Sequence, residues 1–229
     1  MSVVPTPHPV ATKVDAVVFD CDGLLVDTES CWTRAEKALF EQHGLAFGLD
    51  EKKMLIGRTP TALGVILARH FGRPGDEAAL TGALLGRVQQ EVEQGVATLP
   101  GAVDLVRACA ARVPVAVASN SPRPLLRLTL ESTGLAELLP VTVSVDDVAE
   151  PKPAPDIYLA ACAAVGAVPD RSVAFEDSHT GLASAQAAGL SPVFVPSLPD
   201  GVGDTGGAWH LDSLTEPAVH EWAAALVTA

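Results

Sequence analysis

The stretch Val17–Glu29, with the sequence VVFDCDGLLVDTE, constrains the fold of this chain more than any other. It begins with three apolar residues, two of them β-branched, which is typical of the end of a buried parallel strand. Asp20 and Asp22 follow, and alternate residues of an extended chain point to the same side. Gly23 then allows a sharp turn. Helix capping would need only one of the two carboxylates. We therefore expect a functional site, in which a proton or a cation relieves the repulsion between them.

Composition indicates a folded protein with a sizeable core. The chain has 229 residues, of which 48% are hydrophobic and 19% charged. Its net charge of −13 argues against nucleic acid and anionic membranes as partners. No stretch approaches the roughly 20 apolar residues of a membrane span. The four cysteines are scattered, without metal-ligand spacing, as expected for thiols of a reducing compartment. We therefore predict a cytoplasmic protein.

The pattern along the chain divides it into a core and an insertion. Residues 1–13 contain three prolines and no signal-peptide pattern, which predicts a flexible leader. Residues 14–28 hold the first strand, and residues 99–229 alternate strands with helices, ending in a helix over Glu216–Thr228. Residues 29–98 show only helical spacing of apolar residues. The predicted fold class is α/β, with a Rossmann-like parallel-sheet core and an inserted all-helical cap domain.

Polar residues follow the ends of four predicted strands. The carboxyl ends of parallel strands meet at one edge of a sheet, where ligands bind. Taken singly, each residue has a structural explanation, such as a helix cap, a solvated lysine or an acidic first turn. Their shared placement indicates a site. The residues, in strand order, are Asp20 and Asp22, then Ser119 and Asn120, then Lys152, then Glu176 and Asp177.

These residue types suit metal-assisted phosphoryl transfer. Four carboxylates without a supporting His or Cys cluster favour Mg²⁺ over Zn²⁺. The hydroxyl of Ser119 and the ammonium group of Lys152 would hold the remaining phosphoryl oxygens. Hydrolysis of a phosphate monoester needs up to ~10²¹-fold acceleration, whereas one oriented donor supplies about 3–4 kcal/mol. The whole set must therefore act together. The predicted metal ligands are Asp20, Asp22, Glu176 and Asp177.

In these motifs the chain resembles the haloacid dehalogenase-like (HAD) hydrolase superfamily, from about Val14 onward. The motifs, taken in their order and spacing, are specific to that superfamily. The helical insertion between the first and second motifs resembles the cap of the β-phosphoglucomutase-like subgroup. The four motifs are DCDG at 20–23, the strand end at Ser119, KPAPD at 152–156 and EDSHTG at 176–181.

The resemblance implies a role for each motif residue. Asp20 would attack phosphorus and become an aspartyl-phosphate. Asp22 would protonate the leaving oxygen and then activate the hydrolytic water. Mg²⁺ would be held by Asp20, the backbone carbonyl of Asp22 and Asp177, with Glu176 as a direct or water-mediated ligand. The phosphoryl group would be bound by Ser119 and Lys152, assisted by Asn120.

The resemblance leaves three alternatives to a phosphatase. Dehalogenases of this superfamily need neither a second aspartate nor a metal, which disfavours that activity. A β-phosphoglucomutase-type mutase is the main rival, but Trp32 and Ile56 stand where such mutases carry His and Lys, and Arg58 is shifted in register. A non-catalytic binding protein would be expected to have lost one of the site residues. We therefore favour a phosphatase of a small phosphorylated metabolite, acting as a monomer.

The cap is the part expected to select the substrate, because a closing lid supplies the residues that face the leaving group. Arg58 and Thr59, which lie between two predicted helices, are the candidate cap contacts. Trp32 fits an apolar helix stripe and is expected to pack. Arg123, just beyond the second motif, is a candidate contact to an anionic substrate.

Overall fold

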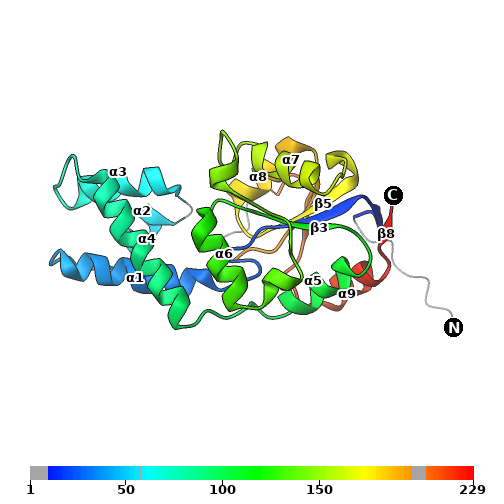
Figure 1. The fold of residues 1–229 in the computed structure, drawn as a ribbon, viewed down its shortest axis with the longest axis horizontal. Helices are drawn as coiled ribbons and strands as arrows, with labels where there is room; N and C mark the ends of the chain where they lie inside the picture. Colours follow the sequence, from blue (N-terminus) through cyan, green and yellow to red (C-terminus); the bar gives the residue numbers. More distant parts are fainter. Residues whose placement is uncertain (1–9, 57, 198–204) are drawn as a thin grey trace.

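The computed structural model describes residues 10–56, 58–197 and 205–229. It has two parts, a parallel sheet covered by helices on both faces and a group of four helices at one end of it (Figure 1). The C-terminus lies at the opposite end of the sheet from the four helices. This arrangement confirms the predicted α/β core with an inserted helical cap.

The six strands of the central sheet all run parallel, in the order β4-β3-β2-β5-β6-β7 among the described residues. The chain adds strands on one side of β2 and then returns to add the rest on its other side. Such a reversal of strand order opens a crevice at the carboxyl ends of the strands, where ligands bind. The strands are β2 (Ala16–Phe19), β3 (Val115–Ser119), β4 (Thr142–Ser144), β5 (Ser172–Glu176), β6 (Ser191–Phe194) and β7 (Trp209–His210).

Both faces of the sheet are buried, because strand alternation sends neighbouring apolar residues to opposite sides. Val17 and Phe19 pack into one cluster and Val18 into another, and all three are fully buried. Helices α7 and α8 cover one face, and α5, α6 and α9 cover the other (Figure 1). The bounds of these helices are α5 (Ala102–Ala110), α6 (Arg123–Ser132), α7 (Asp156–Ala164), α8 (His179–Ala188) and α9 (Pro217–Ala224).

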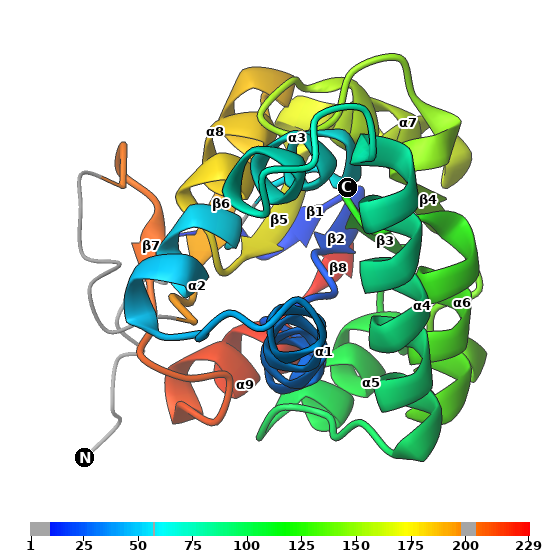
Figure 2. The same cartoon turned by 90° about the vertical axis from the view of Figure 1, so that its left-hand side faces the viewer.

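The cap consists of four helices around a hydrophobic cluster of their own. Leu39, Phe40, Leu67 and Val88 are almost fully buried there. Leu125 of α6 joins the same cluster, so the cap also packs on the core. Figure 2 shows the four helices in front of the sheet when the molecule is viewed from the cap end. They are α1 (Thr28–Gln42), α2 (Leu49–Leu55), α3 (Pro60–His70) and α4 (Glu77–Gln94).

The chain enters and leaves the cap through two adjacent segments. The backbone N–H of Asp27 donates to the carbonyl of Ala97 at 2.9 Å, and that of Leu99 donates to Leu25, also at 2.9 Å. Val26 and Thr98 form an antiparallel bridge between these bonds. The chain thus passes twice, side by side, between the sheet and the four helices.

Part of the predicted flexible leader belongs to the core. Residues 1–9 lie outside the described residues, but Val10 is buried, and the carbonyl of Ala11 accepts a 3.1 Å hydrogen bond from the indole of Trp222. Residues Lys13–Val14 form strand β1. Residues 10–13 are therefore held by partners from the other end of the chain, which local composition does not reveal.

The predicted final helix, Glu216–Thr228, is wrong at its C-terminal end. Helix α9 stops at Ala224, and Val227–Thr228 forms strand β8, which pairs in parallel with β1. The pairing explains the early stop, because these residues satisfy their backbone groups through a strand partner.

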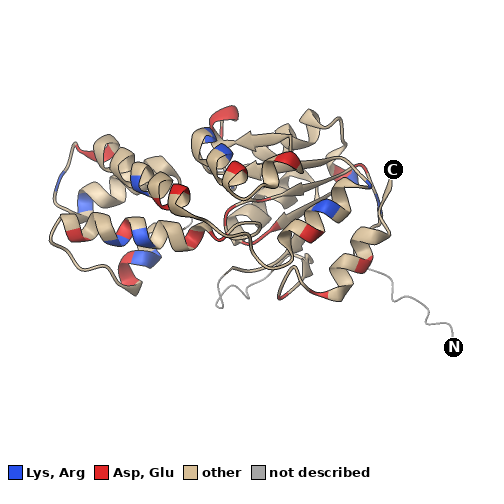
Figure 3. Ribbon diagram, turned by 60° about the horizontal axis from the view of Figure 1, so that its bottom comes forward, with Lys and Arg blue, Asp and Glu red and all other residues tan. Residues whose placement is uncertain are grey.

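Acidic and basic residues are intermixed on the cap helices (Figure 3). Exposed pairs of this kind contribute at most about 1 kcal/mol each, so they favour hydration more than stability. The cap examples are Arg34–Glu91, Lys37–Glu41 and Arg73–Asp76. Within the described part of the chain, no helix combines the length and apolarity needed to cross a membrane.

Candidate active site

A cavity of about 310 Å³ lies where the carboxyl ends of the central strands face the cap. Its core side is formed by residues from five separate segments of the chain. Ser119 and Glu176 belong to the same group but do not line the cavity, because they are fully buried. The core residues at the cavity that sequence analysis predicted are Asp20, Asp22, Asn120, Lys152 and Asp177.

Lys152 is the electrostatic centre of the site. Its Nζ donates to Asp20 Oδ1 at 2.5 Å and to Glu176 Oε1 at 2.6 Å, and all three side chains are buried. Burial alone would lower the pKa of Lys152, but the two carboxylates outweigh it and raise that pKa. Burial raises the pKa of Asp20 well above its ordinary value, although Lys152 opposes the shift. One buried ammonium group therefore compensates two buried carboxylates.

Tyr158 completes this buried group, and sequence analysis missed it. Its hydroxyl donates to Glu176 Oε1 at 2.6 Å, and Lys152 Nζ lies 5.0 Å from the centre of its ring. Burial, and then the charge of Glu176, raises the pKa of Tyr158. A tyrosine on the buried face of α7 is typical of core packing, so the sequence carries no signal for this contact.

Asp22 is held by two hydroxyl groups from the end of β3. Ser119 Oγ donates to Asp22 Oδ2 at 2.8 Å, and Ser121 Oγ donates to the same oxygen at 2.9 Å. The backbone N–H of Ser121 in turn donates to Ser119 Oγ. The predicted Ser119 thus contacts an acid of the site, while Ser121 lines the cavity. Ser121 could have been predicted, because it lies two residues after Ser119 and alternate side chains of an extended chain point to the same side.

The turn after Asp22 requires glycine. Gly23 has a φ of +84°, and a Cβ atom there would lie closer than 3.0 Å to Asp177 Oδ2. A side chain at position 23 would therefore require both a strained backbone and a shift of Asp177.

Asn120 fixes the backbone of Lys152. Its Oδ1 accepts from the Lys152 backbone N–H at 3.0 Å, and its Nδ2 donates to the Lys152 carbonyl at 3.3 Å. The loop that carries the lysine is thereby tied to the end of β3.

The acidic residues fit a divalent cation. One carboxylate oxygen each from Asp20, Glu176 and Asp177 lie within 4.8 Å of one another. Burial, and then the charge of Glu176, raises the pKa of Asp177 to about 7. Such crowding of carboxylates is relieved by a hard cation with oxygen ligands. The side chain of Asp22 does not belong to this group of three.

The predicted cap contacts differ in their positions. Trp32 and Arg58 line the cavity, and Trp32 also packs on the cap cluster. Thr59 instead caps α3, where its Oγ1 accepts from the Ala62 N–H at 3.4 Å. The cavity also receives three charged cap residues that sequence analysis did not select, namely Glu29, Glu36 and Lys52.

Arg123 does not line the cavity. Its guanidinium group pairs with Asp147 and donates to the hydroxyl and carbonyl oxygens of Thr142. The acidic turn after β4 is simply a nearer partner than the site.

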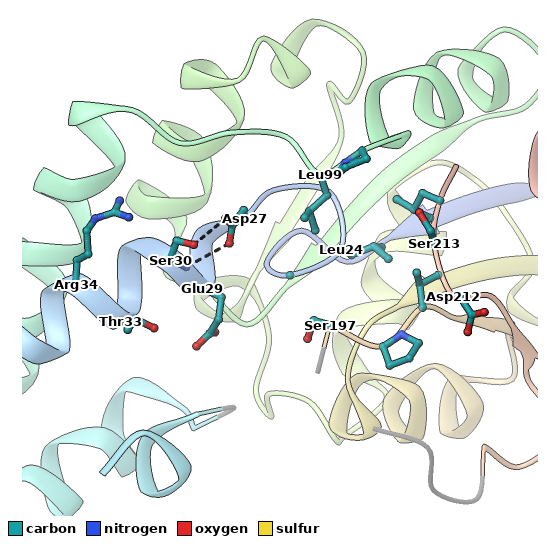
Figure 4. Close-up of a pocket in the computed structure, with 15 residues that line it drawn as sticks. Leu24, Asp27, Glu29, Ser30, Thr33, Arg34, Leu99, Ser197, Asp212 and Ser213 are labelled. Carbon is teal, nitrogen blue, oxygen red and sulfur yellow. Dashed lines mark hydrogen bonds between the residues drawn. The ribbon is translucent and has the colours of Figure 1, made fainter. Parts of the chain in front are cut away.

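A larger cavity, of about 580 Å³, lies beside the two cap linkers (Figure 4). The dashed lines in Figure 4 mark Asp27 accepting from the N–H and the hydroxyl of Ser30, which lies in the first turn of α1. Leu99 and Ser213 form part of its wall. The smaller cavity is the candidate active site, because it contains the buried lysine and the acidic cluster.

The sequence pattern of haloacid dehalogenase-like hydrolases matches residues 14–189. The chain belongs to this family. It is 30% identical, over 175 residues, to validoxylamine A 7'-phosphate phosphatase of Streptomyces hygroscopicus subsp. limoneus, covering 76% of this chain and 81% of that one. The crystal structure of CbbY from Rhodobacter sphaeroides in complex with phosphate is similar, with a TM-score of 0.78 and 29% identity over 91% of this chain and 99% of that chain.

A putative β-phosphoglucomutase from Thermotoga maritima is also similar, with a TM-score of 0.73 and 26% identity over 90% of this chain and 97% of that one. These likenesses confirm the predicted superfamily and the prediction that the protein is an enzyme of the hydrolase class. The four motifs carried that prediction correctly.

Proposed function

We propose that the protein is a Mg²⁺-dependent phosphatase that hydrolyses a small phosphorylated metabolite through an aspartyl-phosphate intermediate. One observation carries the proposal. The buried Asp20 carboxylate lies beside a cationic lysine and two further acids, at the floor of a cavity covered by the cap. A nucleophile in this setting meets a phosphoryl group already surrounded by compensating charge.

Asp20 attacks phosphorus, forming a bond to a carboxylate oxygen while the bond to the leaving oxygen breaks. Asp22 gives its proton to that leaving oxygen. The hydroxyls of Ser119 and Ser121 both donate to Asp22 Oδ2 and so hold this side chain in position. Asp22 then removes a proton from water, and the resulting hydroxide displaces the Asp20 carboxylate from phosphorus.

Lys152 binds the phosphoryl oxygens while it keeps Asp20 in position. Asn120 fixes the lysine through its backbone, and Tyr158 holds Glu176 from behind. When bound, Mg²⁺ would be held by Asp20, Glu176 and Asp177 together with the backbone carbonyl of Asp22, and it would neutralise the charge that develops on the phosphoryl oxygens.

The function is tested by phosphate release from a panel of phosphorylated metabolites, with Mg²⁺ and with EDTA. We expect metal-dependent release from one class of ester, and loss of more than about 10³-fold of that activity in Asp20→Asn. Asp104→Asn is the matched control, because it makes the same change at an exposed position on α5. Equal activity of Asp20→Asn and the control would refute the role of Asp20.

A sugar-phosphate mutase is the second candidate, favoured by the likeness to the putative β-phosphoglucomutase. Trp32 and Ile56, which line the cavity, lack the charge that a second phosphate would require at those positions. Formation of glucose 6-phosphate from β-glucose 1-phosphate without phosphate release would favour the mutase. We also propose that the protein is a monomer, which size-exclusion chromatography would test, and that it is located in the cytoplasm.

A further inference from the structure

Three charged residues of the cap form an ion-pair cluster that faces the catalytic cavity. Lys52 Nζ, from α2, lies 2.7 Å from Glu36 Oε2 and also contacts Glu29 Oε1, both on α1. The three residues line the same cavity as Asp20 and Lys152. We refer to Glu29, Glu36 and Lys52 as the cap triad.

Two of the three side chains of the cap triad are largely buried, whereas that of Glu29 is partly exposed. The side chain of Glu36 is only 3% exposed and that of Lys52 17% exposed. Burial raises the pKa of Glu36, and Lys52 opposes the shift. Replacing a buried ion pair by apolar residues of similar size is often neutral or stabilising, so packing alone does not account for the triad. Trp32, one helical turn before Glu36, shows that this face of α1 accepts a large apolar side chain.

The triad also borders the junction of the cap with the core. Figure 4 shows Glu29 pointing from the start of α1 away from the Asp27–Ser30 pair. It lines both cavities, and its carboxylate reaches Lys52 across the gap between α1 and α2. The three side chains therefore form a polar roof over the part of the cavity that the leaving group of an ester would occupy.

The hydrogen-bonding pattern of this roof suits hydroxyl groups. An ammonium group has three donors, and each carboxylate has several acceptor positions. A hydroxyl both donates and accepts, so it can bind the carboxylates and the ammonium group together. A second anionic group on the ester would lie near the carboxylates of Glu29 and Glu36. These two carboxylates already compensate the charge of Lys52, so like-charge repulsion would disfavour such a ligand.

We propose that Glu29, Glu36 and Lys52 determine substrate specificity, by binding hydroxyl groups of the leaving group and by disfavouring leaving groups that carry a second anion. This inference rests on the proposed phosphatase function and concerns which ester is cleaved. The triad contacts the leaving group and takes no part in the phosphoryl transfer.

The test compares kcat/KM for three kinds of ester in the full chain with Mg²⁺. Glucose 6-phosphate, fructose 1-phosphate and ribose 5-phosphate carry hydroxyls, 2-phosphoglycolate carries a second anion, and p-nitrophenyl phosphate carries neither. We expect the wild type to prefer the best of the three sugar phosphates over 2-phosphoglycolate. Lys52→Met should lower the ratio of kcat/KM for that sugar phosphate to kcat/KM for p-nitrophenyl phosphate by about tenfold or more.

Two controls separate specificity from folding. Lys53→Met makes the same change at an exposed neighbouring position of α2, and Glu41→Gln makes the change of Glu36→Gln at an exposed position of α1. Both controls should keep the wild-type ratio. Glu36→Gln preserves size and should still lower the ratio by about threefold or more, so it carries the test if Lys52→Met does not fold.

The possible failures are distinguishable. The wild type could release phosphate from p-nitrophenyl phosphate and yet prefer 2-phosphoglycolate over all three sugar phosphates. That result would still support the proposed phosphatase function but would overturn this inference. An unchanged ratio in Lys52→Met or in Glu36→Gln would also overturn it. No release from any ester by the wild type would instead refute the proposed function itself.

Discussion

Replacing Gly181 with alanine would place a methyl group where the carboxylate of Glu176 already lies. Gly181 is in the first turn of α8, and a Cβ atom at this position would lie closer than 3.0 Å to Glu176 Cδ and to both carboxylate oxygens. An approach this close forces a shift. The carboxylate cannot move without losing partners, because Lys152 and Tyr158 both donate to its Oε1.

The expected effect follows from two opposing contributions. Alanine in place of glycine favours a helix by about 1 kcal/mol. Displacement of Glu176 removes two hydrogen bonds to a buried charged group, each of about 1.5–3 kcal/mol. We therefore expect Gly181→Ala to lower the free energy of unfolding by about 2–5 kcal/mol. For a chain of this length that corresponds to a decrease in Tm of roughly 4–20 °C.

Urea denaturation and thermal unfolding of the purified variant measure this effect. Gly86→Ala is the matched control, because Gly86 lies within helix α4 and has nothing within 4 Å of an added Cβ. The control should stabilise the protein by about 0.5–1 kcal/mol. If both substitutions change stability in the same direction, the close approach of α8 to Glu176 is not what requires glycine at position 181.

Further predictions concern single contacts. Asp22→Asn should lower kcat for phosphate release by about 10²–10⁴-fold, measured at saturating ester. Tyr158→Phe should lower the free energy of unfolding by about 1–3 kcal/mol in urea denaturation, since Glu176 loses a donor. The Val168 N–H and the Arg171 guanidinium lower the pKa of Asp15. The stability that Asp15 contributes is therefore present above about pH 4 and lost as pH falls through its lowered pKa, so wild type and Asp15→Asn should converge in acid denaturation.

The convergence of most candidate site residues was predictable, because they stand at or just after strand ends. The sheet fixes where each strand finishes, so Asp20 and Asp177, which directly follow β2 and β5, lie at the same edge. Lys152 instead lies in the loop after β4 and depends on Asn120 for its position. The local sequence pattern, which locates the ends of the strands, is enough to predict a site of this kind. It also sufficed for the four cap helices, whose apolar residues recur at helical spacing.

The contacts that sequence analysis missed depend on tertiary packing. Tyr158 reaches Glu176 only because α7 covers the sheet, and strand β8 exists only because β1 lies beside it. Glu36 did carry a signal, since it is a charged residue four positions after Trp32 on the buried side of α1. A charged residue on an apolar helix face indicates either a buried partner or a site, and here Lys52 shows that it has the partner.

We propose that catalysis and selection of the ester belong to two parts of the chain, each with its own hydrophobic cluster. Asp20 follows β2, which is paired on both sides and buried on both faces, so its position is fixed by the sheet. The triad residues Glu36 and Lys52 project from helices that pack around the cap cluster. The cap joins the core through two adjacent linkers and the contact of Leu125 with the cap cluster. A change in the triad should therefore alter which ester is cleaved while Asp20 keeps its position, because no strand of the described sheet depends on the cap for its hydrogen bonds.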